Sequence, residues 1–188
     1  MNKIKYFEKE ISYIKEGTYR EDIKKLINLL PDYFFTIPAS STGKYHPKFA
    51  STEHGLVKHT KAAVRIAYDM FETVNNFTDK DKDLVIMALI MHDGLKKGNP
   101  EEQYTRFDHP LLVSKLIMEH ASELSMDIND VRRMCMLIES HMGKWNTSKF
   151  SKIELPLPKD ELSRYVARCD YLSSRSYLNI KFNKLNID

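Results

Sequence analysis

The sequence predicts an all-α protein, a single-domain bundle of about six to eight helices. Apolar residues recur every three or four positions through most of the chain, the spacing that places them on one face of a helix. Helix start and stop signals separate these periodic runs. The length of 188 residues fits one domain with a substantial core, and 42% hydrophobic and 29% charged residues are typical of a globular protein.

Two helices and a long loop are expected in the N-terminal third of the chain. Residues 3–15 repeat apolar side chains at helical spacing, and Gly17 is a C-terminal signal for that helix. Thr18 and Glu21 have the spacing of a capping box, which predicts a second helix that ends before the next proline. Residues 38–53 have no period and contain two prolines and a glycine. They predict a loop, and a loop of this length is often a lid or a binding loop.

Five further helices are expected, and one of them has the composition of a central helix. Residues 80–93 are apolar nearly all round, which is typical of a helix buried on every side, and Gly94 is expected to end it in the left-handed conformation. Asp127 is expected to be the N-cap of a later helix. In the tail from Asn179, apolar and polar residues alternate weakly, which predicts a short edge strand or a disordered end. The expected helices span about residues 55–74, 80–93, 109–121, 128–142 and 159–177.

Charge and composition exclude several classes of function. The net charge of +3 is too small to indicate nucleic-acid binding by itself, although a local basic surface would favour phosphorylated ligands. The N-terminus lacks the apolar stretch of a signal peptide, and the longest apolar run, residues 84–91, is too short to span a bilayer. We therefore expect a cytoplasmic protein with no membrane partner, and two buried, reduced cysteines, Cys135 and Cys169.

Histidines and aspartates continue the apolar faces of the predicted helices. Imidazoles and carboxylates are costly to bury without a partner, and they are the side chains that hold first-row divalent metals. One buried histidine is most often a core imidazole bonded to backbone, whereas six such residues on five helices favour a metal site. His46, His54 and His120 lie in loops or beside polar neighbours and are not expected there. The six candidate ligands are His59, His92, Asp93, His109, His141 and Asp170.

The order of these residues resembles the HD superfamily of metal-dependent phosphohydrolases, an all-α fold named for its His-Asp doublet. The doublet here is His92-Asp93, Lys96 matches the HD-x-x-K form of the motif, and the likeness covers roughly residues 54–175. The resemblance implies a two-metal centre in which Asp93 bridges both ions. The first ion would be held by His59, His92, Asp93 and Asp170, and the second by Asp93, His109 and His141.

The resemblance also implies how the chain is organised. Residues 38–60 are similar to the approach to the first histidine in HD-domain 3′-to-5′ exoribonucleases. Some two-metal members have a glutamate four residues before the first histidine, and this sequence has Gly55 there, which argues against a third metal. We expect one domain, residues 1–188, with N-terminal helices and a loop in 1–53, the HD core in 54–175 and a tail in 176–188.

Catalysis at such a centre would use two divalent ions that activate a water and clamp a phosphoryl oxygen. Manganese or iron is the expected metal, and cobalt, zinc, nickel or magnesium stay open. Asp93 and Lys96 are the expected catalytic residues; the lysine would meet phosphate charge, and its alternative is a solvated loop lysine. Trp145 is expected to stack on a base, or else to cover the end of the bundle. The candidate substrate-binding residues are Lys96, Lys144, Trp145, Lys44 and Arg168.

Three functions are compatible with these residues. The favoured one is a phosphohydrolase that cleaves a phosphoester of a nucleotide, a cyclic nucleotide or a short single-stranded nucleic-acid end. The ligands also resemble those of diiron oxygenases of the superfamily, such as the myo-inositol oxygenases. A non-catalytic HD interaction module is the third, although every ligand position is filled here. A small domain of modest charge favours a nucleotide-sized phosphorylated substrate over a long polymer, and a homo-oligomer stays open.

Overall fold

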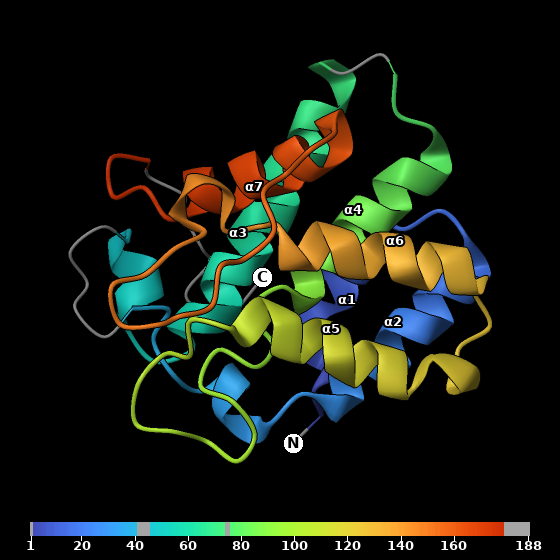
Figure 1. The fold of residues 1–188 in the computed structure, drawn as a ribbon. Helices are drawn as coiled ribbons and strands as arrows, with labels where there is room; N and C mark the ends of the chain where they lie inside the picture. Colours follow the sequence, from blue (N-terminus) through green and yellow to red (C-terminus); the bar gives the residue numbers. More distant parts are fainter. Residues whose placement is uncertain (1, 41–45, 74–75, 179–188) are drawn as a thin grey trace.

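The fold is built from helices joined by loops and short 3₁₀ turns (Figure 1). The computed structural model describes residues 2–40, 46–73 and 76–178, and every regular element in these ranges is a helix. The all-α prediction is therefore confirmed, and none of the described helices has the length and apolar character needed to cross a membrane. The α-helices are α1 (Glu8–Ile11), α2 (Gly17–Leu29), α3 (Gly55–Met70), α4 (Asp79–Met91), α5 (His109–Glu119), α6 (Ile128–Glu139) and α7 (Glu161–Ser173).

Helix α4 occupies the middle of the bundle. Residues 83–91 of this helix are all buried, as expected of a helix that is apolar on every side. It packs against α2, α3, α6 and α7, while α5 and α6 run side by side (Figure 1). A capping box begins the helix, because Thr78 Oγ1 accepts from the amide of Asp81 and the Asp81 carboxylate accepts from the amide of Thr78. The helix ends at Met91, so the His-Asp doublet begins in the interior of the molecule.

Buried carboxylates fasten the N-terminal elements to the rest of the bundle. Asp83 of α4 accepts hydrogen bonds from the backbone amides of residues 15–16, at 2.8 and 2.9 Å. Asp22 of α2 accepts from the amides of residues 125–126, just before α6, at 2.7 and 2.8 Å. Each carboxylate thus satisfies two amides that have no helical partner. The connections that precede α2 and α6 are therefore held in place by side chains of other helices.

The boundaries of the N-terminal helices differ from the sequence prediction. The first helical segment is a 3₁₀ turn followed by the short α1, and Gly17 begins α2 instead of ending the helix before it. The predicted capping box of Thr18 and Glu21 is wrong. The carboxylate of Glu16 accepts from the amide of Thr18 and caps α2 instead. The amide of Glu16 is in turn held by a buried carboxylate of α4, which fixes the start of α2 at this point.

All five later helices end earlier than predicted, and three of them do so by three or four residues. In a longer α6 the carbonyl of residue 138 would accept from the amide of residue 142, whereas here it accepts from the amide of His141 at 3.2 Å. The helix thus closes on a tighter turn, and the His141 ring adds a second hydrogen bond to the same carbonyl, at 2.7 Å. The observed last residues of α3, α6 and α7 are Met70, Glu139 and Ser173.

Gly94 has a steric role and not the predicted conformational one. Its backbone is not left-handed, and a Cβ atom at this position would lie 2.5 Å from the side chain of Leu30. Asp127 caps α6 as predicted. The predicted tail from Asn179 lies outside the described residues. Both cysteines, Cys135 and Cys169, are buried free thiols as predicted.

A buried ion cluster joins α1 to α3, the helix that carries the first histidine ligand. The carboxylate of Glu10 is fully buried, accepts from Arg65 Nε at 2.8 Å and lies 3.3 Å from Lys61 Nζ. The Lys61 side chain is 2% exposed, and its ammonium also donates to the carbonyl of Tyr6. Two cations share one carboxylate inside the bundle, so the cluster depends on the charge of Glu10.

Replacing Glu10 with glutamine should destabilise the protein by about 3–5 kcal/mol, because the cations of α3 then lose the charge that offsets their desolvation. Urea unfolding followed by circular dichroism measures the free energy of unfolding. Glu21→Gln is the matched control, since its ion pair with Lys24 is largely exposed and should contribute less than about 1 kcal/mol. An equal loss in the free energy of unfolding in the two variants would contradict the stabilising role of the buried ion cluster.

Candidate metal centre

Four imidazoles and two carboxylates meet in the middle of the bundle. They come from α3, from the residues that follow α4, from the start of α5, from the loop after α6 and from α7. Five of them are almost completely buried, and the sixth, Asp170, has an 18% exposed side chain that borders a cavity. The structure thus brings together all six side chains that the sequence singled out, His59, His92, Asp93, His109, His141 and Asp170.

The carboxylate of Asp93 lies between two pairs of imidazoles. Its Oδ2 atom is 3.6 Å from Nε2 of His59 and 3.6 Å from Nε2 of His92. Its Oδ1 atom is 2.9 Å from Nε2 of His109 and 3.9 Å from Nε2 of His141. One carboxylate thus presents one oxygen to each pair, which is the arrangement of a ligand that bridges two neighbouring positions.

The carboxylate of Asp170 faces one of these pairs. Its Oδ1 atom is 3.0 Å from Nε2 of His59 and 3.3 Å from Nε2 of His92. Two overlapping sets of potential ligand atoms therefore exist, within 4.8 Å of one another in each set, and they share His92. The sets are His59, His92 and Asp170 on one side, and His92, Asp93 and His141 on the other.

Backbone carbonyls determine which ring nitrogen of three histidines faces the centre. Nδ1 of His92, His109 and His141 lies 2.6–2.7 Å from the carbonyl oxygen of the residue three positions earlier. Because a carbonyl only accepts, Nδ1 carries the proton and Nε2 keeps its lone pair. For His92 and His141 this carbonyl belongs to the last turn of a helix, where carbonyls lack the helical amide four residues on; the carbonyl of residue 138 also accepts from the His141 amide. The helix ends therefore hold these rings in the tautomer that binds a metal.

Ser173 holds the fourth imidazole, and sequence reasoning misses it. Its Oγ donates to the carbonyl of Asp170 at 2.7 Å and lies 3.0 Å from Nδ1 of His59. Since the hydroxyl proton is used on the carbonyl, the oxygen accepts from Nδ1–H, and Nε2 of His59 faces the centre. The one signal in the sequence is that Ser173 follows Asp170 by three residues and so shares its helical face.

Burial and neighbouring groups set the charges of the centre. Burial would raise the pKa of Asp93, but the Lys96 ammonium, 2.6 Å from Oδ2, and the His92 imidazole hold that pKa well below its usual range. Burial is likewise outweighed at Asp170, where the neighbouring His59 and His92 hold the pKa well below normal. Burial and the nearby His92 lower the pKa of His141 to about 3. The centre thus offers ionised carboxylates and a neutral imidazole, the forms that bind metals.

Two ring nitrogens indicate that these residues fit a divalent metal. Nε2 of His92 and Nε2 of His109 are buried and have no hydrogen-bond partner in the described part of the chain. Carboxylate oxygens lie near both nitrogens, and a lone pair that faces a carboxylate is repelled unless a proton or a metal ion lies between them. A cation between them would satisfy both groups. The mixed nitrogen and oxygen donor set suits manganese, iron, cobalt or zinc.

A cavity of about 190 Å³ opens onto the centre, and Lys96, Trp145 and Arg175 are among its walls. His46 also lines it, which corrects the expectation that this histidine lies away from the site. Its ring meets the His59 ring edge-on, with 5.4 Å between centroids. Burial, with His59 and Lys96 nearby, lowers the pKa of His46 to about 3. Sequence reasoning misses this residue because its position depends on the path of a loop that has no periodicity.

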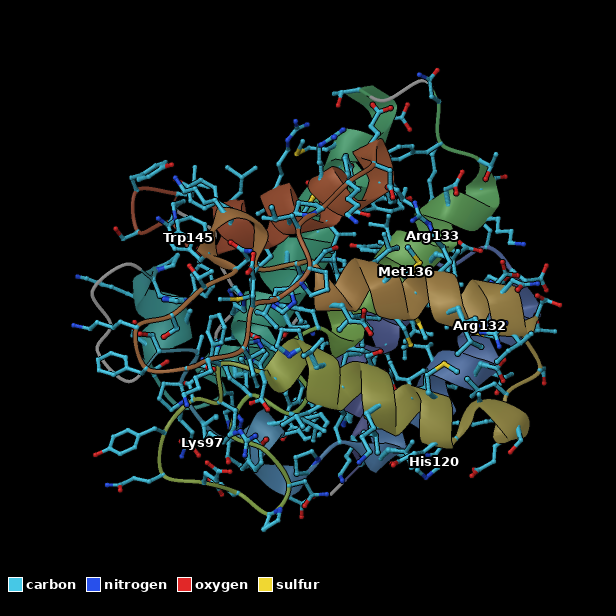
Figure 2. The ribbon with its side chains drawn as sticks, viewed as in Figure 1. Lys97, His120, Arg132, Arg133, Met136 and Trp145 are labelled. Atoms are coloured by element: carbon cyan, nitrogen blue, oxygen red, sulfur yellow. The ribbon has the colours of Figure 1, made fainter. Side chains whose placement is uncertain are left out.

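The remaining predicted residues lie in several places. Lys144 and Arg168 line a groove beside the metal-centre cavity. Lys44 lies outside the described residues. His54 and His120 are away from the cavity, as expected: Nδ1 of His54 contacts a backbone carbonyl, and His120 lies at the far end of α5 (Figure 2).

Replacing Ser173 with alanine should lower the affinity for Mn²⁺ by about 10–100-fold, because Nδ1–H of His59 loses its acceptor and the ring is no longer oriented. Isothermal titration calorimetry measures this affinity. Ser140→Ala is the matched control, since the Ser140 hydroxyl is also buried but donates to a helical carbonyl and to no imidazole. An unchanged affinity in Ser173→Ala would contradict the positioning role.

Metal affinity should fall as the pH is lowered from about 8 to about 6, by up to about tenfold per pH unit for one displaced proton. Burial lowers the pKa of His92, but Asp93 and Asp170 outweigh it and raise that pKa overall. The metal-free protein therefore keeps a proton on His92 to higher pH than free histidine does, and a metal must displace it. Calorimetry in two buffers of different ionisation enthalpy counts the released protons, and an affinity independent of pH would contradict this protonation state.

The geometry of the centre agrees with a comparison to known proteins. A protein-family model, the HD domain, matches residues 56–175, from the first turn of α3 to just beyond α7. This range covers more than half of the chain and contains all six residues of the centre. No curated protein and no solved structure matches the chain significantly. The chain therefore belongs to the HD-domain family, a superfamily of the metal-dependent phosphohydrolase type.

Proposed function

We propose that this protein is a phosphohydrolase that cleaves a phosphoester of a nucleotide, a cyclic nucleotide or a short single-stranded nucleic-acid end at a dinuclear centre of manganese or iron. The observation that carries this proposal is the carboxylate of Asp93, which presents one oxygen to each of two imidazole pairs. That arrangement supports two metal positions joined by one bridging ligand.

Each metal position has its own ligands in this proposal. Divalent ions at such a centre supply a water nucleophile at neutral pH and neutralise charge on the phosphoryl group. The protein's part is to hold the donor atoms: helix-end carbonyls and Ser173 orient the imidazoles, and low pKa values keep the carboxylates ionised. The first position would take His59, His92, Asp93 and Asp170, and the second would take His109 and His141 together with Asp93, which both positions share.

Cations in the cavity wall support a phosphorylated substrate. Lys96 and Arg175 both line the cavity, and the Lys96 side chain is 14% exposed. We assign to Lys96 the contact with phosphoryl oxygens, because a fixed ammonium stabilises charge that develops there. In the reaction the oxygen of one water bonds to phosphorus, the ester P–O bond breaks, and the leaving oxygen takes a proton.

Two other functions would use the same ligands. A diiron oxygenase would need iron and molecular oxygen, and a non-catalytic HD module would need neither metal nor substrate. The cations at the cavity favour an anionic substrate, which is why we propose the phosphohydrolase.

Asp93→Asn should lower kcat for bis(p-nitrophenyl) phosphate by about 10²–10³-fold in protein loaded with Mn²⁺, because an amide cannot bridge two cations with two anionic oxygens. Asp69→Asn is the matched control: this carboxylate lies on α3, the helix of His59, but is exposed. Its activity should equal that of the wild-type protein. Metal content is measured in all three proteins.

Two results would overturn the proposal in different ways. Hydrolysis that persists in Asp93→Asn would remove the bridging role. Oxygen consumption by the iron-loaded protein, together with no phosphoester hydrolysis in the manganese-loaded protein, would replace the phosphohydrolase with the oxygenase.

A further inference from the structure

A second hollow adjoins the cavity at the metal centre. Its volume is about 350 Å³, and it shares Met142, Trp145 and Tyr171 with that cavity, so the two are neighbours on one surface. None of the described residues that line it is acidic. We call it the basic groove; its charged and aromatic lining residues are Lys144, Trp145, Arg164, Arg168 and Tyr171.

Two stacked aromatic rings separate the basic groove from the metal-centre cavity. The ring centroids of Trp145 and Tyr171 are 5.3 Å apart, and the ring planes are inclined by 20°. Lys144 Nζ lies 4.8 Å from the centre of the Trp145 ring, and the Arg175 guanidinium lies 4.3 Å from that of Tyr171. Because Trp145 is 44% exposed, part of its ring is open to a ligand. An exposed ring flanked by cations is the kind of surface on which nucleobases stack.

Cations along α7 connect the groove with the metal centre. Arg164, Arg168, Tyr171 and Arg175 follow one another at intervals of four, three and four residues. This spacing places Arg164, Arg168 and Tyr171 along one side of α7, and Arg175, two residues beyond the helix, contacts the Tyr171 ring. Arg164 and Arg168 line the groove, whereas Arg175 lines the cavity. A row of positive charge therefore leads from the groove to the metal centre.

Two of the groove cations have no ion-pair partner of their own. Lys144 and Arg168 are exposed, and neither makes an ion pair with a carboxylate in the described ranges. Surface cations that are already paired would have to break a contact before they bound an anion. These two are available for a phosphate without that cost.

We infer that the substrate of this site is a single-stranded oligonucleotide whose scissile phosphodiester lies at the metal centre, with a base stacked on Trp145 and the next phosphate in the basic groove. This inference rests on the proposed function and narrows it. A mononucleotide would use the cavity alone, whereas a chain of at least two nucleotides uses the groove as well. Recognition involves phosphates and ring faces, so the site discriminates little between bases.

The reaction remains the hydrolysis described above, with one water consumed for each phosphodiester and with a phosphate monoester and an alcohol as products. The groove changes its substrate preference and not its chemistry. Inorganic polyphosphate would contact the cations but not the ring, and a nucleoside would contact the ring but not the cations. A nucleic-acid strand is the ligand that uses both along one path.

Trp145 gives a direct readout of this binding, because it is the one tryptophan of the chain. Its fluorescence is titrated in EDTA-treated protein, to prevent hydrolysis, with thymidine trinucleotide, thymidine monophosphate and tripolyphosphate. We expect the trinucleotide to quench the fluorescence and to bind at least about tenfold more tightly than the monophosphate, and tripolyphosphate to cause no quenching. Equal binding of the trinucleotide and the monophosphate, or trinucleotide binding without quenching, would overturn the inference.

A double variant tests the cations of the groove. Lys144→Gln with Arg168→Gln should weaken trinucleotide binding about tenfold and lower the slope of log K against log salt by about 0.7 for each lost phosphate contact. The control removes the same charge elsewhere, with Lys149→Gln and Arg132→Gln. Lys149 Nζ lies 4.8 Å from the centre of the Phe150 ring, the same distance as Lys144 Nζ from the centre of the Trp145 ring. Arg132 lies across the molecule from Trp145 (Figure 2). The same loss of trinucleotide affinity in both double variants would mean that only the net charge of the protein matters for binding, and would contradict the inference.

Failure of this inference can be told apart from failure of the proposed function. Hydrolysis of bis(p-nitrophenyl) phosphate by the manganese-loaded wild-type protein tests the function without the groove. If this ester is cleaved and the trinucleotide binds no more tightly than the monophosphate, the inference fails and the proposed phosphohydrolase function stands. If the ester is not cleaved but the trinucleotide quenches Trp145, the groove binds nucleic acid and the proposed function fails.

Discussion

Two ionised carboxylates inside an apolar bundle are the constraint on which this structure depends. Asp93 follows a helix whose last residues are all apolar and buried, and an unpaired carboxylate there would cost several kcal/mol. Imidazoles from three other segments and the ammonium of Lys96 offset that cost. The segments that carry these groups must therefore meet at the same point. The candidate metal centre is in this way also the place that fixes the helices relative to one another.

Helix ends, more than helix faces, orient the imidazoles. His92 directly follows α4, and His141 lies two residues beyond α6. Each ring donates Nδ1–H to a carbonyl of the last turn, which both stabilises the helix end and directs Nε2 toward the centre. Local stability and the metal-binding tautomer thus come from one hydrogen bond.

Helical periodicity explains what could be predicted from the sequence and what could not. A polar side chain that continues an apolar face must point inward, so the all-α fold and the inward direction of residues such as His59 and Asp170 follow from spacing. That they share one centre is what the resemblance to the HD superfamily implies. His46 lies in a loop, where no period relates sequence to direction, although its ring reaches that of His59. Ser173 is distinguished from other serines only by its contacts, which no spacing reveals. The metal-binding and catalytic roles of these residues stay predictions.

Net charge is a poor guide to the surface beside this centre. The sum of +3 counts Asp22, Asp83 and Asp93 like any other acids, yet all three are buried against backbone amides, imidazoles or an ammonium. The lysine and arginines of the basic groove are exposed instead, and no described acid lines the groove with them. These carboxylates are held inside the protein and do not line the groove, whereas the exposed cations act on a ligand within about one Debye length. The potential at the groove is therefore more positive than the formal charge indicates, and a modest total is compatible with a polyanionic substrate.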